Sequence, residues 1–314
     1  MLPHLDDFLL NLQTNKYSPK TVYNYERDLK VFDKFLTESS IDFEQLDKKA
    51  ITYYKGYLVS GDRKTAILAQ LGEKELDSCS VNRMLSALRS YLRYLVDIDY
   101  PCPLPPEAVK LTKAGRKHPQ VAELNDLVRL IEAPSSLESN SKVALRNRAM
   151  LKILFATGMR ISELCGLNRN QIDASGRIFI TGKGRKQRFV YLTPRAKYHL
   201  DNYLTARQDT APALFVPYAG RNVVKAKRRI STNYFQDRIK RYREKLKINV
   251  PTSAHSLRHG FATYLAEEGA NPAAIQLLLG HESLDTTTRY VHASDRYAEE
   301  THRKFHPLAE PDDN

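Results

Sequence analysis

Apolar side chains recur every three or four positions in two stretches of the first hundred residues. The first stretch follows Ser18-Pro19 and contains Val22, Tyr25, Leu29, Phe32 and Leu36. The second contains Val81, Leu85, Leu88, Leu92 and Leu95. This period places the apolar side chains on one buried face of a helix, and serine followed by proline is typical of a helix start. The N-terminal part is therefore predicted to be a small helical bundle. Its candidate phosphate contacts, which could equally be ordinary surface or core residues, are Arg83, Arg89, Arg93 and Tyr94.

The pattern in the second half predicts further helices and one β-hairpin. Helices are expected over residues 125–131, 144–156 and 233–246, and Gly269 and Gly280 mark the ends of two more. Residues 177–181 and 188–192 are rich in β-branched and aromatic side chains and flank a glycine-containing turn. The fold class is therefore predicted to be mainly α with a small β-hairpin or sheet.

A proline-rich and basic stretch at residues 101–119 interrupts these patterns. Proline removes a backbone donor and fixes φ, so no regular element is expected here. We place the domain boundary in this stretch, which predicts a helical N-terminal domain over residues 1–105, a basic linker over 106–118 and a second domain over 119–314. Such a linker can lie against a DNA backbone or serve only as a stiff spacer, and the two interpretations are compatible.

The net positive charge of the chain lies entirely in its second part, and this points to a class of partner. The chain has 49 Lys and Arg residues against 36 Asp and Glu, a formal net charge of +13. Residues 1–105 hold 14 basic and 15 acidic residues, which leaves 35 basic and 21 acidic residues for the rest. One basic cluster is usually a solvated face. Two clusters in the same half, at residues 177–188 and 221–247, favour a nucleic acid as the partner, since neutralised phosphates release counterions.

Composition excludes several other classes of protein. The 314 residues are 42% hydrophobic and 27% charged, which is typical of a globular chain rather than a disordered one. No apolar run approaches the roughly 18 residues that a membrane helix needs, and no secretory leader is visible. The three cysteines lack metal-ligand or disulfide-framework spacing. We therefore expect a soluble, cytoplasmic protein without a structural metal.

Four short segments carry candidate chemistry, and each also has an ordinary explanation. They are ATGMRISELCGL (156–167), GKGRKQR (182–188), HSLRH (255–259) and LLGHESLDTTTRY (278–290). Arg160 and Glu163 can form a merely structural pair. His255 and Arg258 share one face at a helix start, which suits a phosphate, but His-x-x-Arg is common by chance. The turn lysine Lys183, the helix-end histidine His281 and the tyrosine Tyr290 are equally ordinary when each is taken alone.

Together the four segments resemble the tyrosine recombinase (phage integrase) family. The active site of that family contains, in chain order, Arg, Lys, His-x-x-Arg, His or Trp, and Tyr. The corresponding residues here are Arg160, Lys183, His255, Arg258, His281 and Tyr290, separated by 23, 72, 3, 23 and 9 residues. The residues that flank these positions also match the family, and the resemblance covers nearly the whole chain. It implies a SAM-like, DNA-clamping core-binding domain followed by an α+β catalytic domain.

The resemblance also implies a mechanism that needs neither ATP, a metal nor any other cofactor. Tyr290 would attack a DNA phosphodiester and form a 3′-phosphotyrosyl link. Arg160 and Arg258 would clamp the non-bridging oxygens, and His281 would donate a hydrogen bond to the same phosphate. His255 would be the base and Lys183 the acid, with Lys186 as the rival for that position. Glu163 would pair with Arg160 and orient its guanidinium, without being a catalytic residue itself.

Within the family, the chain looks most like the Xer subgroup, which resolves circular chromosome dimers during cell division. It starts directly with the core-binding domain, and residues 293–314 are similar to the Xer tail helix, which docks on a neighbouring subunit in a ring of four. One departure is a stretch at residues 61–78 that is longer than usual. The resemblance implies a dif-like inverted repeat in double-stranded DNA as the target, a homo-tetramer or a hetero-tetramer with a paralogous recombinase, a possible DNA translocase as activator, and a place on the nucleoid.

Three other functions stay open at this point. The first is an integrase or excisionase of a phage, plasmid or transposon, with the same chemistry on another target. The second is a type IB topoisomerase, which shares the chemistry but acts as a monomer. The third is a catalytically silent DNA-binding protein, against which the complete set of six residues argues. The sequence identifies neither the target DNA nor the number of recombinases in the system.

Overall fold

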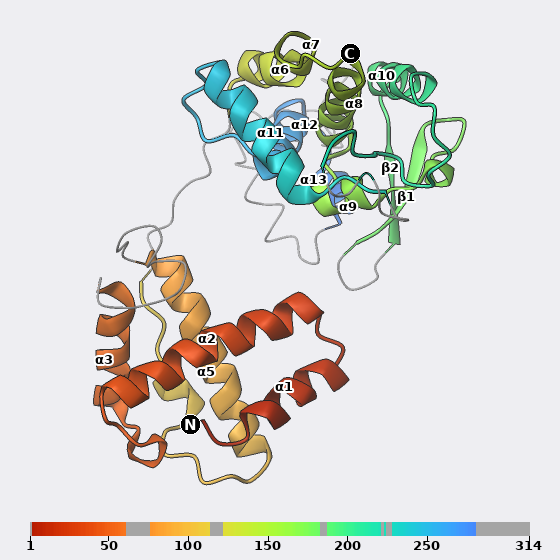
Figure 1. Ribbon diagram of the computed structural model, residues 1–314. Coiled ribbons are helices and arrows are strands. Elements are labelled where there is room, and N and C mark those ends of the chain that lie inside the picture. Colours follow the sequence, from red (N-terminus) through yellow and green to blue (C-terminus); the bar gives the residue numbers. More distant parts are fainter. Residues whose placement is uncertain are drawn as a thin grey trace, which may run out of the picture. The chain divides into compact units, whose positions relative to one another are not determined.

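The computed structural model describes residues 2–60, 76–113, 122–182, 187–220, 223 and 228–280 of the chain (Figure 1). The chain divides into two compact units, Met1–His118 and Pro119–Asn314. Among the described residues, no helix combines the length and the apolar character needed to cross a membrane.

The N-terminal unit is a bundle of α1 (Leu5–Thr14), α2 (Pro19–Glu38), α3 (Lys48–Val59) and α5 (Ser78–Asp97), with a 3-10 turn at Phe43–Gln45. Ser18 caps α2 by accepting a hydrogen bond from the Thr21 main-chain N–H, and Asp47 and Asp77 cap α3 and α5 in the same way. α2 and α5 pack against each other through the predicted apolar faces, which include the fully buried Leu29 and Leu85. The prediction of a small helical bundle is therefore confirmed.

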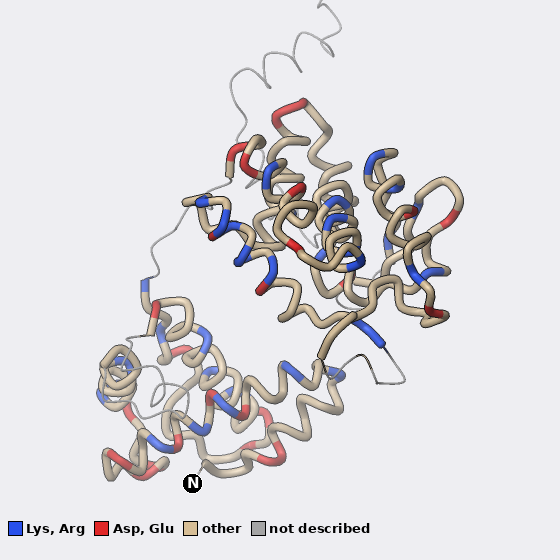
Figure 2. Tube along the Cα trace, turned by 45° about the horizontal axis from the view of Figure 1, so that its top comes forward, with Lys and Arg blue, Asp and Glu red and all other residues tan. Residues whose placement is uncertain are grey.

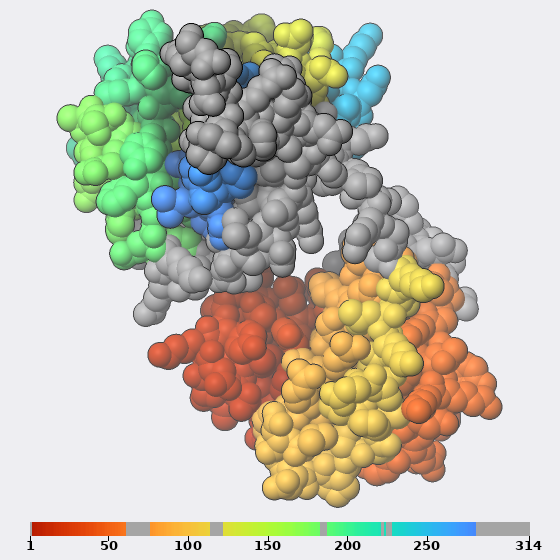
Figure 3. Space-filling model, turned by 180° about the vertical axis from the view of Figure 1, so that it is seen from behind, coloured from red at the N-terminus to blue at the C-terminus, as the bar shows by residue number. Residues whose placement is uncertain are grey.

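The proline-rich segment that follows α5 lies on the surface of this unit as far as Thr112 (Figure 3). It contains a 3-10 turn at Pro106–Ala108, although no regular element was expected there. The Asn82 side chain binds both the main-chain N–H of Thr112, at 2.8 Å, and its carbonyl, at 2.9 Å. Arg89 donates to the Val109 carbonyl and Arg83 pairs with the buried Asp28. Arg83 and Arg89 thus have partners within the protein, whereas Arg93 keeps 59% of its side chain exposed beside Glu107. Residues 114–121 of the linker lie outside the described residues.

The second unit is built around one buried helix, α8 (Ser141–Thr157), on which α7 (Pro134–Leu137), α10 (Pro194–Thr205) and α12 (Ala254–Glu267) pack. Met150, Leu151 and Leu154 of α8 are fully buried. The surrounding elements are α6 (Leu124–Glu132), α9 (Ile161–Gly166), a 3-10 turn at Arg169–Gln171, α11 (Thr232–Lys245) and α13 (Pro272–Leu279). Lys and Arg occur in both units (Figure 2). The sequence of α11 contains five of them.

The hairpin consists of β1 (Arg177–Thr181) and β2 (Gln187–Tyr191), paired antiparallel with Ile178 opposite Val190 and Ile180 opposite Arg188. Exposed and buried positions alternate along both strands, so Ile178, Ile180, Arg188 and Val190 face inward. The helices predicted over 125–131, 144–156 and 233–246 are present within one to three residues at each end. The mainly helical fold with one small sheet is therefore confirmed.

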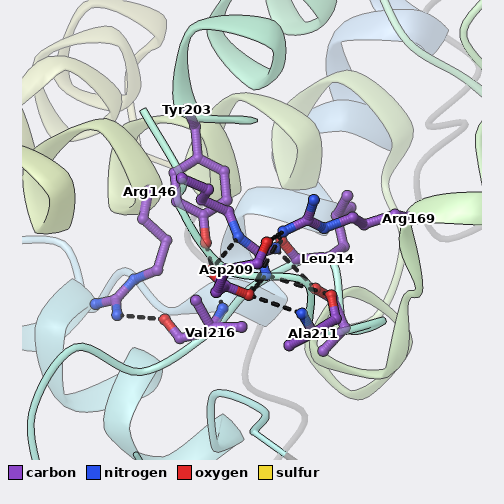
Figure 4. A network of polar contacts seen from close by, with 9 residues as sticks. Arg146, Arg169, Tyr203, Asp209, Ala211, Leu214 and Val216 are labelled. Atoms are coloured by element: carbon purple, nitrogen blue, oxygen red, sulfur yellow. Dashed lines mark hydrogen bonds and ion pairs between the residues drawn. The ribbon is translucent and has the colours of Figure 1, made fainter. Parts of the chain in front are cut away.

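Buried arginines hold the loop between α10 and α11 (Figure 4). Arg207 donates to the carbonyls of Ala213 and Leu214 and pairs with Asp209, and Arg146 donates to the Val216 carbonyl at 2.9 Å. The hydrogen bond from Arg207 is the main cause that lowers the pKa of Asp209, so the carboxylate stays charged beside the guanidinium. These bonds fix the chain ahead of α11, which carries much of the basic charge.

Candidate active site

A tight turn between α8 and α9 places Arg160. Gly158 ends α8 with φ +59°, and a Cβ atom at this position would lie 2.4 Å from Cδ1 of Phe261. The chain then turns into α9, where the Arg160 main-chain N–H donates to Oε2 of Glu163 at 2.8 Å and the guanidinium donates to Oε1 at 3.1 Å. The Arg160 side chain keeps an exposed fraction of 35%, whereas Glu163 keeps 6%. The expected pair is present, and it leaves the guanidinium accessible to a ligand.

Arg258 on α12 lies beside this turn and is buried. Its Nη1 donates to the Gly158 carbonyl and its Nη2 to the Leu279 carbonyl, both at 2.7 Å. Arg258 thus joins the end of α8, two residues before Arg160, to the end of α13. Because both terminal nitrogens of Arg258 donate to main-chain carbonyls, its guanidinium has a fixed orientation beside the turn that carries Arg160.

His255 lies in the first turn of α12, where Ser253 caps the helix. Its Nε2 is 2.8 Å from Nε2 of His259, one turn further along, and the two rings are nearly perpendicular. Desolvation lowers the pKa of His255 below its usual 6.5, and the positive charges of Arg258 and Arg160 lower it further. Desolvation and the neighbouring His255 lower the pKa of His259 to about 4. Both imidazoles are therefore neutral at pH 7, and His255 is able to accept a proton.

Sequence reasoning missed Arg188, which the structure brings into the same site. This side chain reaches from β2 to Glu163, with Nη1 3.0 Å from Oε1 and Nη2 2.8 Å from Oε2. Burial acts to raise the pKa of Glu163, but the hydrogen bonds and charges of Arg188 and Arg160 outweigh it, so the net shift is downward. The only available signal was an arginine at an inward-facing position of a strand that is otherwise apolar on that side.

A hollow of about 460 Å³ with a mixed polar and apolar lining lies between α9 and the hairpin. Its lining includes Arg160, Ser162, Gln171, Thr181 and Gly182. It therefore contains the exposed Arg160 guanidinium and reaches the end of β1, two residues before Lys183. Within the described part of the chain, no three metal-ligating side chains come together.

Three of the six expected site residues can be placed, and three cannot. Arg160, His255 and Arg258 come together where α9, α12 and the end of α8 meet. Lys183, its rival Lys186, His281 and Tyr290 lie outside the described residues, so their roles stay predictions. The same holds for the tail at residues 293–314.

Comparison with known proteins gives matches over most of the chain. The model of the "Phage integrase family" matches residues 120–296, and that of "Phage integrase, N-terminal SAM-like domain" matches residues 5–98. Tyrosine recombinase XerD of Staphylococcus epidermidis is 30% identical over 97% of this chain and 99% of its own. Tyrosine recombinase XerC of Psychromonas ingrahamii is 31% identical over 98% and 97%, and that of Pediococcus pentosaceus is 34% identical over 93% of both chains.

Two solved structures share the fold at lower identity. XerH bound to palindromic difH substrate, in a post-cleavage complex, has a TM-score of 0.67 and 22% identity over 90% of this chain and 78% of its own. A lambda integrase dimer bound to a COC′ core site has a TM-score of 0.69 and 17% identity over 91% and 97%. Both structures support the assignment of the two-unit, mainly helical fold.

Proposed function

Because this chain belongs to the phage integrase family, and is thus a tyrosine recombinase that cleaves and rejoins DNA, we propose an active site built around Tyr290 as the nucleophile. The other members of the proposed set are Arg160, Lys183, His255, Arg258 and His281. The observation that carries the proposal is that Arg160, at the start of α9, lies beside the fixed Arg258 and the neutral His255, which both belong to α12.

The proposed reaction is a transesterification, in which one phosphorus–oxygen bond breaks and another forms. The Tyr290 phenol attacks the phosphorus, the bond from phosphorus to the 5′-oxygen breaks, and a 3′-phosphotyrosyl link forms. His255 takes the phenolic proton, and Lys183 gives a proton to the departing 5′-oxygen. A 5′-hydroxyl of the exchanging strand then reverses these steps through a Holliday junction. The phosphotyrosine retains the bond energy, so no ATP is needed.

The described residues supply the electrostatics that this reaction needs. Negative charge builds on the non-bridging oxygens, and the exposed Arg160 guanidinium beside the fixed Arg258 places permanent positive charge there. A phenol of ordinary pKa about 10 needs a base at neutral pH. His255 suits that role because its lowered pKa keeps it neutral.

The proposed cellular role is Xer-type resolution of circular chromosome dimers at a dif-like site. Its support is near-full-length identity of about 30% to proteins named XerC and XerD. The proposed active form is a tetramer on double-stranded DNA with an inverted repeat, made of this chain alone or with a paralogous recombinase, in which the tail at 293–314 docks on a neighbour. A DNA translocase as activator and a place on the nucleoid belong to the same proposal.

A nicked suicide substrate tests this function. A duplex that carries a candidate dif-like site is incubated with the wild type and with Tyr290→Phe, with EDTA present, and run on a denaturing gel. The wild type is expected to give a covalent protein–DNA band that the variant lacks, while both bind the duplex equally in a gel shift, because one hydroxyl hardly changes the many phosphate contacts. Cleavage by Tyr290→Phe would refute the assigned nucleophile. A band only on DNA from a mobile-element junction would move the role to an integrase.

A further inference from the structure

Arg188 is a buried charged residue that the proposed mechanism does not use. It occupies an inward-facing position of β2, next to the apolar Ile178, Ile180 and Val190. Its side chain keeps an exposed fraction of 6%, so a direct contact with DNA is not its role. Burying a guanidinium is costly unless each end is paired. The reason for its burial must therefore lie in the groups that it binds.

Arg188 joins three separate elements of the second unit. Nη1 and Nη2 form a two-pronged pair with Glu163 of α9, at 3.0 and 2.8 Å. Nε donates to the Leu278 carbonyl in the last turn of α13, at 2.8 Å. The Arg188 stem also fills the space beside Gly280, where an added Cβ would lie 3.0 Å from Cδ of Arg188. One side chain thus connects β2, the start of α9 and the end of α13.

Each of the three elements leads directly to a residue of the proposed active site. Arg160 is the residue directly before α9, at its N-cap position. Lys183 follows the last residue of β1 by two positions and precedes β2 by four. His281 is the next residue after Gly280. We propose that Arg188 is a positioning residue, an inference that rests on the proposed function. Arg188 fixes the hairpin strands relative to Arg160, and this places Lys183, the proposed general acid, at the scissile phosphate.

Ile178, Ile180 and Val190 are buried in the core and hold the strands, and Arg188 adds a polar link from the start of β2 to α9 and α13. The backbone pairing sets the shape of the hairpin but not where the tip lies relative to α9. Arg160 makes two bonds of its own to Glu163, so it keeps this partner when Arg188 is removed. Loss of Arg188 should therefore disturb the hairpin more than the first arginine. A displacement of about 1 Å at a reacting group can slow a reaction about 100-fold.

A change of leaving group separates this role from a merely structural one. In a duplex with a 5′-bridging phosphorothiolate at the scissile position, sulfur replaces the departing oxygen. A thiolate leaves without being protonated, so the general acid is no longer required. A variant that fails to deliver the acid should recover on this substrate. A variant that fails to stabilise the phosphate charge should stay slow.

The experiment measures single-turnover formation of the covalent adduct on both substrates with the full-length protein. We expect Arg188→Met to be about 100-fold slower on the ordinary phosphodiester and within about threefold of the wild type on the phosphorothiolate. Lys183→Ala should show the same pattern, and Arg160→Lys should stay slow on both. Gel-shift affinity should be unchanged in Arg188→Met, because the side chain is buried.

Arg129→Met is the matched control. Arg129 also joins a carboxylate, Asp126, to a main-chain carbonyl, that of Leu246, but it is half exposed and lies on α6. Its rates should match the wild type on both substrates. If Arg188→Met proves too unstable, Arg188→Lys replaces it, since lysine keeps the charge beside Glu163 but has no fork to bind Leu278 as well.

The outcomes distinguish failure of this inference from failure of the proposed function. An Arg188 variant that stays slow on the phosphorothiolate, while Lys183→Ala recovers, overturns the positioning role alone. An Arg188 variant as fast as the wild type on the phosphodiester overturns it as well. If Lys183→Ala itself does not recover, the general-acid assignment is wrong, and the inference that depends on it falls too.

Discussion

Gly158→Ala tests whether the turn between α8 and α9 is as constrained as its geometry indicates. Gly158 has φ +59°, and an alanine in this left-handed region costs about 1–2 kcal/mol. The new Cβ would also lie 2.4 Å from Cδ1 and 2.8 Å from Cε1 of Phe261. Overpacking of this kind costs about 1–3 kcal/mol. The expected loss in free energy of unfolding is therefore about 2–5 kcal/mol, or about 5–15 °C in Tm for a unit of this size.

The chain has no tryptophan, so urea and thermal unfolding are best followed by circular dichroism. Gly166→Ala is the matched control, because Gly166 has no positive φ and no atom within 4 Å of an added Cβ. It should change the unfolding free energy by less than about 1 kcal/mol. In a Phe261→Ala background the clashing ring atoms are gone, and the cost of Gly158→Ala should fall toward the backbone part of about 1–2 kcal/mol. A Gly158→Ala variant as stable as the wild type would refute the reasoning.

Two further predictions concern His255, the proposed base, and the buried Arg207. Desolvation, Arg258 and Arg160 lower the pKa of His255, so its imidazole stays neutral as the pH falls through 6.5. The acid limb of the single-turnover cleavage rate should therefore have its midpoint below pH 6.5. A midpoint above that value would contradict the electrostatic account. Arg207→Met should reduce the unfolding free energy by roughly 2–4 kcal/mol, because Asp209 and the carbonyls of Ala213 and Leu214 lose their partner. Urea unfolding measures this loss, with Arg195→Met as the control because Arg195 is exposed.

Elements with a strong hydrophobic period could be predicted from the sequence. The apolar faces of α2 and α5 are buried as their spacing indicated, and the turn-flanked β-prone runs form the hairpin. The end of α13 at Gly280 was also predicted, because glycine is the usual residue where a helix ends in the left-handed region. In each case a local signal determines a local structure.

Buried arginines could not be predicted, because their partners lie far away in the sequence. Arg229 belongs to a basic cluster that we interpreted as a nucleic-acid surface, yet its guanidinium donates to the carbonyls of Cys165 and Leu167 at the end of α9. Arg188 was counted in the same way and instead binds Glu163. The general tendency of arginine to lie on the surface outweighs any local signal, and only the fold shows which ones turn inward.

Arg188 and Arg258 share one physical task, which is to satisfy main-chain carbonyls at helix ends. α13 has no basic residue in its own last turn, and its carbonyls at Leu278 and Leu279 accept from Arg188 and Arg258. The negative end of a helix favours cations, so these contacts stabilise both the helix and the buried charges. Since the cations come from β2 and α12, the path of the chain into residue 281 depends on two elements distant in sequence. The same carbonyl contacts that hold the fold therefore set the spacing between the catalytic segments.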